Sequence, residues 1–236
     1  MRFYGIVLLL DKESSIEAAV VNRRLHDISS DPPIQLRFNE RMCVLADEES
    51  LMRVFDEDVG DVVGSWPHIS LVHKALGDTT DVLRLVRAIR EAVVPLKMRR
   101  IVGGFTSYQP RGRYIFRMSS MSKPLINLHL AVAHAASSID GDCRMPLPDD
   151  LEGLDVMEWE RYGWLHAGAN YRYPHITIGH VPEEHVPLAM SRMPGAKRDP
   201  ALRDMHSGDI WSSSRIGIGP LGPHGTLERL IASISL

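Results

Sequence analysis

Apolar side chains dominate the start of the chain and then give way to a polar segment. Residues 2–10 are rich in aromatic and branched apolar side chains, a composition typical of a buried strand. Ser14 and Glu17 stand in the spacing of a capping box and predict a helix that opens there and runs to about residue 27. A proline pair then breaks the chain, and residues 35–45 have the weaker character of a second strand.

The clearest helical pattern lies between residues 80 and 94, after a strand candidate at residues 65–71. Apolar side chains recur there every three or four positions and so fall on one face of a helix. Thr80 is placed to cap the first turn. The stripe consists of Val82, Val86, Ile89 and Val93.

A strand pair and a further helix follow. Residues 99–108 and 113–118 have strand character on either side of a Gln-Pro-Arg-Gly segment that favours a hairpin turn. Pro124 stands where a helix can begin, because proline is tolerated in the first helical turn. The predicted apolar stripe of this helix consists of Leu125, Leu128, Val132 and Ala136.

The C-terminal part of the chain gives a weaker pattern. Residues 137–168 are interpreted as a long insertion or lid, with a plain surface loop as the alternative. Residues 172–181 return to strand character, whereas residues 182–209 are irregular. Residues 214–218 and 227–234 are expected to form late strands or a short helix. This order of elements predicts an α+β or α/β protein.

The composition agrees with a globular chain. The 236 residues are 44% hydrophobic and 24% charged, which excludes disordered, collagen-like and disulfide-scaffold classes. The length fits one large domain or two closely associated lobes. The two cysteines, Cys43 and Cys143, lack CxxC spacing, so we expect a reducing, cytoplasmic environment.

Charge and hydropathy limit the expected partners. The formal net charge is −3 at pH 7, so we expect no coating of long nucleic acid, which needs a basic face. A single phosphate, a nucleotide or an RNA end is compatible with this charge. The apolar run at residues 5–10 is far shorter than a membrane-spanning helix and lacks the features of a secretory signal, so we expect no membrane partner.

Two similar segments lie almost half the chain apart. WPHISLVH (residues 66–73) aligns with YPHITIGH (residues 173–180). They share an aromatic residue before a proline, the triplet His-x-[Ser/Thr], aliphatic residues around its hydroxyl member, and a final histidine. The bare triplet is a weak signal, since His224-Gly225-Thr226 matches it without strand-like neighbours. The long repeat is therefore the main candidate for a functional site.

Strand geometry places the polar residues of each copy together. Side chains alternate between the two faces of a strand, so His68 and Ser70 point to one side, as do His175 and Thr177. Each copy then presents an imidazole beside a hydroxyl. A pseudo-twofold between the halves of the chain would bring the two pairs together across one cleft.

Two imidazoles and two hydroxyls suit phosphodiester chemistry. A neutral histidine can take a proton from the attacking water or ribose hydroxyl, while an imidazolium protonates the leaving oxygen. The ordinary pKa of histidine, about 6.5, allows both roles. The hydroxyls would donate to the phosphate oxygens as negative charge develops. The predicted catalytic residues are His68, Ser70, His175 and Thr177, and the chemistry requires neither a metal nor a cofactor.

The two segments resemble the paired His-x-[Ser/Thr] motifs of the two-histidine (2H) phosphoesterase superfamily, which includes 2′-5′ RNA ligase-like proteins and cyclic nucleotide phosphodiesterases. The first strand also looks like the usual opening of that family. The resemblance implies a bilobal, pseudo-twofold α+β fold, in which two antiparallel sheets line a central cleft with helices outside. It further implies metal-independent hydrolysis or formation of 2′,3′-cyclic phosphates or 2′-5′ phosphodiester bonds.

The resemblance and the repeat together predict a single bilobal domain over residues 1–236. Its interleaved lobes correspond approximately to the sequence halves 1–97 and 98–236, and residues 140–165 form an insertion. The acidic residues of this insertion would repel a long RNA. The expected partner is therefore a small nucleotide or an RNA-end phosphoester.

The sequence departs from the family where a basic residue, commonly arginine, follows the motif strand. His73 and His180 stand there, and strict alternation puts them on the opposite face, in packing or at the surface. Tyr173 and Trp66, which precede the motifs, could bind substrate by stacking on a base or could pack against the scaffold. Arg113, with the other arginines of its hairpin, could bind substrate in a basic rim or lie on a solvated face.

Other interpretations stay open. His68 and His175 could each be a structural histidine, although the matching hydroxyls favour catalysis. A non-catalytic module could bind a nucleotide or RNA end on the same fold, although binding alone does not need two proton-transfer groups. A metallohydrolase could use His180, His185 and neighbouring carboxylates, although Pro182 interrupts the helix that a metal motif would need.

Overall fold

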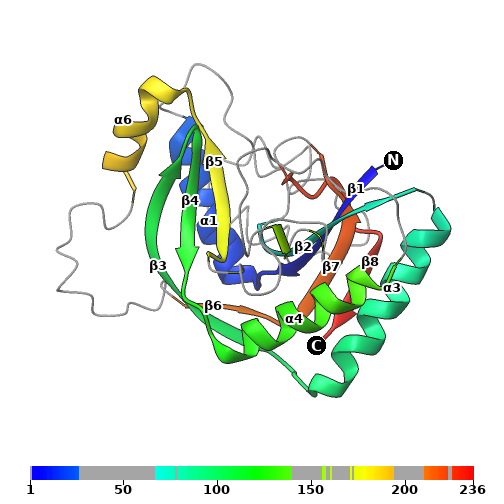
Figure 1. Ribbon diagram of the computed structural model, residues 1–236. Helices are drawn as coiled ribbons and strands as arrows, with labels where there is room; N and C mark the ends of the chain where they lie inside the picture. Colours follow the sequence, from blue (N-terminus) through cyan, green and yellow to red (C-terminus); the bar gives the residue numbers. More distant parts are fainter. Residues whose placement is uncertain are drawn as a thin grey trace.

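Two antiparallel four-stranded sheets lie side by side in the computed structural model (Figure 1). The structure describes residues 2–26, 67–77, 79–139, 156–157, 160, 171, 173–193, 210–222 and 225–236. The strand predicted at residues 35–45 lies outside these ranges, as do both cysteines and nearly all of the insertion predicted at residues 140–165.

The first sheet is built around the N-terminal strand. Its order is β2-β1-β7-β8, so β1 has a neighbour on each side and is buried along its C-terminal half, which accounts for its unbroken apolar run. β7 and β8 lie where late strands were expected, with bounds shifted towards the C-terminus. The strands are β1 (Arg2–Leu9), β2 (His68–Leu76), β7 (Arg215–Pro220) and β8 (Ala232–Ser235).

The second sheet has the order β5-β4-β3-β6. β3 and β4 form the predicted hairpin, but its turn is tighter than expected. β3 continues through Arg111, and Gly112 takes a φ of 55°, a left-handed conformation that favours glycine. The strands are β3 (Ile101–Arg111), β4 (Tyr114–Ser119), β5 (His175–His180) and β6 (Ile210–Ser213).

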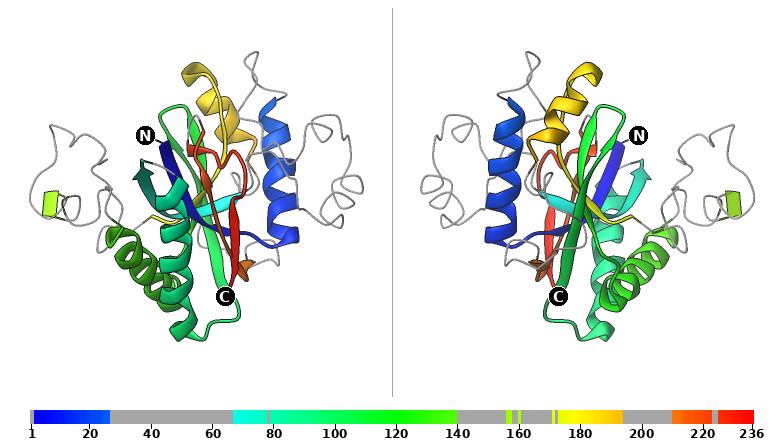
Figure 2. Two further views of the ribbon diagram at one scale, coloured as in Figure 1. Left: turned by 90° about the vertical axis from the view of Figure 1, so that its right-hand side faces the viewer. Right: turned by 90° about the vertical axis from the view of Figure 1, so that its left-hand side faces the viewer.

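The two sheets draw on distant parts of the chain. β7 and β8 come from the C-terminal part and join β1 in the first sheet. Conversely, α1 (Lys12–His26) lies near the N-terminus and packs against β5 and β6 of the second sheet. Figure 2 shows α1 on one side of the sheets and α3 (Thr79–Val93) and α4 (Lys123–Ser137) on the other. The architecture is α+β with its helices outside, as predicted.

α1 begins earlier than the capping-box pattern predicts. Its first residue is Lys12, and Asp11 caps it: Asp11 Oδ1 accepts the Ser14 N–H at 2.8 Å, and the Asp11 carbonyl accepts the Ser15 N–H at 3.0 Å. Ser14 is buried within the first turn. The assignment of Ser14 as the cap is therefore wrong, since the carboxylate in front of it serves that role.

α3 and α4 agree with the predicted helices. Ser122 caps α4 by accepting the Leu125 N–H at 3.3 Å, and Pro124 lies in the first turn. α4 packs against both α3 and β2. All four predicted stripe residues of α4 are buried, and of the four predicted for α3 only Val86 is partly exposed. Apolar periodicity thus located both α4, which packs on β2, and α3, which packs on α4.

Short helical segments lie directly after α3 and in the segment that was predicted to be irregular. A 3-10 turn (Val94–Leu96) follows α3, and a second one (Glu183–His185) leads into α6 (Val186–Ser191). The last helix was not predicted, because six residues are too few to give a periodic signal. Across the described ranges, no helix is long and apolar enough to span a membrane.

Candidate active site

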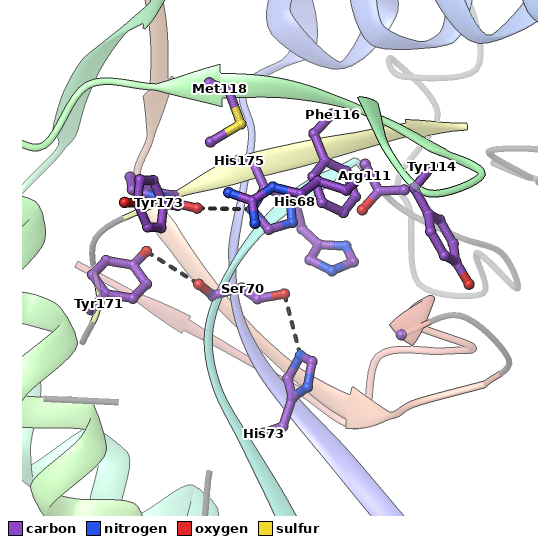
Figure 3. Close-up of a pocket in the computed structure, with 13 residues that line it drawn as sticks. His68, Ser70, His73, Arg111, Tyr114, Phe116, Met118, Tyr171, Tyr173 and His175 are labelled. Atoms are coloured by element: carbon purple, nitrogen blue, oxygen red, sulfur yellow. Dashed lines mark hydrogen bonds between the residues drawn. The ribbon is translucent and has the colours of Figure 1, made fainter. Parts of the chain in front are cut away.

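A pocket of about 440 Å³ lies between the two motif strands, β2 and β5, which contact each other although they belong to different sheets. Small-molecule sites usually have volumes of about 300–1,000 Å³. His68 and Ser70 line the pocket from β2, and His175 and Thr177 line it from β5. Figure 3 shows His68, Ser70 and His175 around the same space. The structure thus brings the two copies of the repeat together.

Alternation along each strand sets this arrangement. The motif residues are partly exposed at the pocket, and their neighbours point into the core. These aliphatic neighbours anchor both strands against the helices, so the motif side chains project from a rigid support. The buried neighbours are Ile69, Leu71, Ile176 and Ile178.

His175 is held by its backbone and by an aromatic ring. Its Nδ1 lies 2.8 Å from the Tyr173 carbonyl oxygen, and since a carbonyl only accepts, Nδ1 carries the hydrogen. The Phe116 ring stacks on the imidazole with 4.0 Å between centroids. Because Nδ1 carries this bond, Nε2 is the ring nitrogen that is able to accept a proton when the ring is neutral or to donate one when the ring is charged.

β2 carries a bulge directly after its motif. Consecutive residues of β1 pair with Ser70 and Val72, which leaves Leu71 as an extra residue on β2. The extra residue reverses the alternation, so His73 lines the pocket beside Ser70, with 3.3 Å between His73 Nε2 and Ser70 Oγ (Figure 3). The expectation that His73 faces away from the motif residues is therefore wrong.

β5 carries a bulge at the same position of the repeat. Consecutive residues of β4 pair with Thr177 and Gly179, which leaves Ile178 as the extra residue. His180 is half-buried and lies against Tyr114, with 5.6 Å between ring centroids. It is not one of the described residues that line the pocket. The two copies therefore share a bulge, but the final histidine lines the pocket in the first copy and packs against Tyr114 in the second.

A helix side chain binds the extra residue of each bulge. His129 Nδ1, from α4, donates to the Leu71 carbonyl at 3.0 Å. Asn22 Nδ2, from α1, donates to the Ile178 carbonyl at 2.6 Å. An extra residue in a bulge leaves the strand ladder, so its buried carbonyl needs another donor. The helices supply these donors from opposite sides of the molecule.

Tyr171 adds a second contact to the β2 bulge. Its hydroxyl donates to the Ser70 carbonyl at 3.1 Å, and its ring stacks on His129 with 3.9 Å between centroids and 4° between planes. Burial lowers the pKa of His129 to about 4, against a smaller raising effect of its bond to the Leu71 carbonyl. Burial also raises the pKa of Tyr171. Both groups are therefore neutral near pH 7 and act as fixed hydrogen-bond donors.

Aromatic side chains form one wall of the pocket. Tyr173 lines it with 59% of its surface exposed, and the Arg111 guanidinium lies 5.5 Å from the centre of its ring. Tyr114 and Phe116, one strand away, stack at 6.1 Å between centroids. Flat apolar faces with a nearby cation suit a nucleobase or another aromatic group.

Of the arginines on the β3–β4 hairpin, Arg111 rather than the predicted Arg113 lines the pocket. Arg113 is exposed and is not among the described residues lining the pocket, whereas Arg111 is. Arg117 is buried, with its Nη1 2.8 Å from Glu17 Oε2, so it joins β4 to α1. The three arginines therefore do not form the single basic rim that was considered.

Two candidates from the sequence fall at the edge of the described chain. Trp66, the aromatic residue before the first motif, lies outside the described residues. His224 of the third triplet also lies outside them, although the adjacent Gly225 lines the pocket. Of the two aromatic residues expected beside the motifs, the structure therefore places Tyr173.

The described part of the chain contains no ligand set for the metal site that was considered as an alternative. Within it, no group of three or more His, Cys, Asp or Glu side chains is arranged to hold a metal ion. His180 and His185, with the carboxylates between them, do not form such a group.

The comparisons with known proteins give the fold. No protein-family model matches the sequence, and neither does any curated protein. Among solved structures, the chain is similar to Escherichia coli LigT complexed with 3′-AMP, with a TM-score of 0.50 and 10% sequence identity over 100% of this chain and 98% of that chain. The chain has the LigT fold. LigT is a 2H phosphoesterase superfamily member, so the fold implied by the paired motifs is confirmed.

Two further structures match over nearly the whole chain with lower scores than LigT. A phosphoesterase has a TM-score of 0.48 and 9% identity over 100% of this chain and 99% of that chain. Usb1 of Kluyveromyces marxianus has a TM-score of 0.46 and 12% identity over 99% of this chain and 97% of that chain.

Some pocket residues of this LigT fold were missed from the sequence. Strand alternation in the predicted hairpin could have found Tyr114, Phe116 and Met118, which share a face of β4 and line the pocket. His73 could not be found in this way, because no residue type in β2 marks the bulge that turns it.

Proposed function

We propose that this chain is a 2H phosphoesterase that hydrolyses, or reversibly forms, 2′,3′-cyclic phosphate or 2′-5′ phosphodiester bonds in a nucleotide or RNA end. The observation that carries the proposal is the meeting of His68, Ser70, His175 and Thr177 in one pocket. These residues come from two sheets and from distant parts of the chain. Structural histidines have no need to share a pocket with matched hydroxyls.

The two histidines transfer protons to and from the reacting oxygens. In hydrolysis of a cyclic phosphate, one neutral imidazole takes a proton from water as the water oxygen bonds to phosphorus. The other, as imidazolium, gives a proton to the ribose oxygen as its bond to phosphorus breaks. In ligation a 5′-hydroxyl takes the place of the water, and cleavage of a 2′-5′ bond to a cyclic phosphate is the reverse of that step, with the roles of the two histidines exchanged. The Tyr173 carbonyl holds His175 so that Nε2 performs its part.

The two hydroxyls bind the phosphate. Ser70 and Thr177 donate hydrogen bonds to its non-bridging oxygens, whose negative charge rises in the transition state. Donors fixed on strands act without reorganisation, which is why their rigid support matters. These steps use the side chains of this chain alone and require no metal.

The pocket walls favour a small substrate. The volume of about 440 Å³ suits one nucleotide, and the LigT structure contains a ligand of this size, 3′-AMP. Tyr173 and Arg111 offer a platform for a base beside the phosphate site. A net charge of −3 works against binding along an extended RNA and favours a nucleotide or a chain end.

The test is turnover by the full chain in excess chelator. Purified protein is incubated with 2′,3′-cyclic nucleotides and with 2′-5′-linked dinucleotides, and the products are identified by chromatography. We expect nucleoside monophosphates or nucleosides, and a rate at least about tenfold lower in Ser70→Ala and in Thr177→Ala. Ser138→Ala, on the surface after α4, is the matched control and keeps the wild-type rate.

Two results would contradict the proposal. Nucleotide binding without turnover of any substrate would favour the non-catalytic binding module. Turnover that requires an added metal ion would favour the metallohydrolase, whose ligands would then have to come from elsewhere in the chain.

A further inference from the structure

The bulge in β2 creates a contact that a regular strand could not make. Ser70 and His73 are three positions apart, and strict alternation would put them on opposite faces. With Leu71 as the extra residue, both line the pocket. In Figure 3 the His73 imidazole points at the Ser70 hydroxyl from the side opposite His175. Among the described residues, three histidines therefore line the pocket: His68, His73 and His175.

Buried side chains fix the backbone that carries the Ser70–His73 contact. Tyr171 binds the Ser70 carbonyl and His129 binds the Leu71 carbonyl, so the two peptide groups that define the bulge are fixed to buried side chains. His73 itself is half-buried on β2. The 3.3 Å between His73 Nε2 and Ser70 Oγ is thus a property of a braced backbone.

The direction of the Ser70–His73 hydrogen bond follows from counting hydrogens. A serine hydroxyl has one proton, which it can give either to His73 or to a phosphate oxygen. When an anionic phosphate occupies the site, the charge-assisted bond to phosphate is the stronger one. Ser70 can keep its bond to His73 only if Nε2 then carries a hydrogen and donates it to Oγ.

We propose that His73 is a positioning residue: its Nε2–H donates to Ser70 Oγ and directs the hydroxyl proton to the substrate phosphate. His73 transfers no proton to the reacting oxygens. It fixes the hydroxyl rotor and makes Ser70 a better donor, because accepting one hydrogen bond strengthens the one that is donated. This inference rests on the proposed phosphate site, and it assigns His73 a role that its copy His180 does not share.

The test is a double-mutant cycle read by calorimetric binding of 3′-AMP, which does not depend on turnover. The variants are Ser70→Ala, His73→Phe, their combination, and His73→Gln, whose amide can donate from near the Nε2 position. We expect Ser70→Ala and His73→Phe each to weaken binding about tenfold, the value of one hydrogen bond. Because both substitutions remove the same Ser70–His73 hydrogen bond, the double variant should also bind 3′-AMP about tenfold more weakly than wild type, rather than about a hundredfold.

Two variants separate positioning from a general structural effect. His73→Gln should bind within about threefold of wild type, since it restores the donor. His134→Phe, at an exposed site on α4, is the control: it should leave binding unchanged and combine additively with Ser70→Ala. Thermal unfolding of each variant checks that the chain is folded.

The outcomes distinguish this inference from the proposed function. Additive losses in the cycle, or a His73→Gln variant as weak as His73→Phe, would overturn the positioning role and leave the function standing. Coupled losses in a protein that turns over no substrate would support the positioning role and overturn the function. A wild-type chain that does not bind 3′-AMP would overturn the role, and failure to turn over any cyclic or 2′-5′ substrate would overturn the function separately.

Discussion

His129 lies beneath β2 with its ring against Tyr171 and its Nδ1 hydrogen on the Leu71 carbonyl. Desolvation by burial keeps it neutral, with a pKa of about 4. The sequence pattern places His129 on a predicted helix but gives no sign of this contact. Its role depends on which strand carbonyl it meets, and that is decided by packing between α4 and β2 rather than by local sequence.

The buried imidazole makes stability depend on pH. In the unfolded chain His129 regains its ordinary pKa of about 6.5, so between about pH 6.5 and pH 4 the unfolded state binds more protons. The free energy of unfolding should therefore fall as the pH is lowered through this range, by about 2 kcal/mol from His129 alone between about pH 7.5 and pH 5. Denaturant unfolding at these pH values measures it.

Substitution isolates this contribution from other titrating groups. In His129→Asn the amide can still donate to the Leu71 carbonyl but does not titrate, so the pH dependence should be smaller by that amount. His134→Asn, on the exposed face of the same helix, should keep the wild-type dependence. Equal pH dependence in wild type and His129→Asn would contradict the account.

A substitution of Tyr173 tests whether its ring binds the base of the substrate. Its ring is largely exposed beside the pocket, with Arg111 over it. Stacking on one base contributes about 1–3 kcal/mol, so Tyr173→Ala should raise KM about tenfold or more with little change in kcat. Tyr173→Phe keeps the ring and should keep KM. Steady-state kinetics on a cyclic nucleotide measure both constants. An unchanged KM in Tyr173→Ala would show that Tyr173 does not bind the base.

Among the elements, apolar patterns predicted β1 from its unbroken run, α3 and α4 from a stripe on one face, and the β3–β4 hairpin from strand character on either side of a turn. The bulges in β2 and β5 escaped prediction. A bulge is decided by its partner strand and by the donors that reach its free carbonyl, and Asn22 and His129 lie far from those carbonyls in sequence. Alternation therefore identified the motif residues correctly as neighbours but misplaced His73.

Asn22 tests the bulge in β5. Its amide donates to the Ile178 carbonyl, and the adjacent Gly179 allows the close approach, since a Cβ there would lie 2.7 Å from Leu25 and 2.9 Å from Asn22. Asn22→Ala leaves this carbonyl without its donor in a buried place and should lower the free energy of unfolding by about 2 kcal/mol. Glu13→Ala, exposed in the first turn of α1, should change it by less than about 0.5 kcal/mol. Equal stability of the two variants would contradict the assignment.

At the scale of the molecule, the pocket exists because strands from two sheets meet. The repeat predicted which residues would come together, since two copies with the same spacing imply two similar strands. The resemblance predicts interleaved lobes, but no local pattern shows which elements cross over. That β7 and β8 join the first sheet and α1 packs on the second depends on long-range contacts. The chain has the LigT fold, and the proposed chemistry rests on the motif residues that this fold brings together.

We propose that His68 and His175 act together as the proton-transfer pair of this pocket. The most direct measurement is kcat for 2′,3′-cyclic nucleotide hydrolysis in excess chelator by His68→Ala, His175→Ala and the double variant. We expect kcat to fall about 10²–10⁴-fold in each single variant, with no comparable further loss in the double variant, because each histidine needs the other. Wild-type rates in either single variant would contradict it.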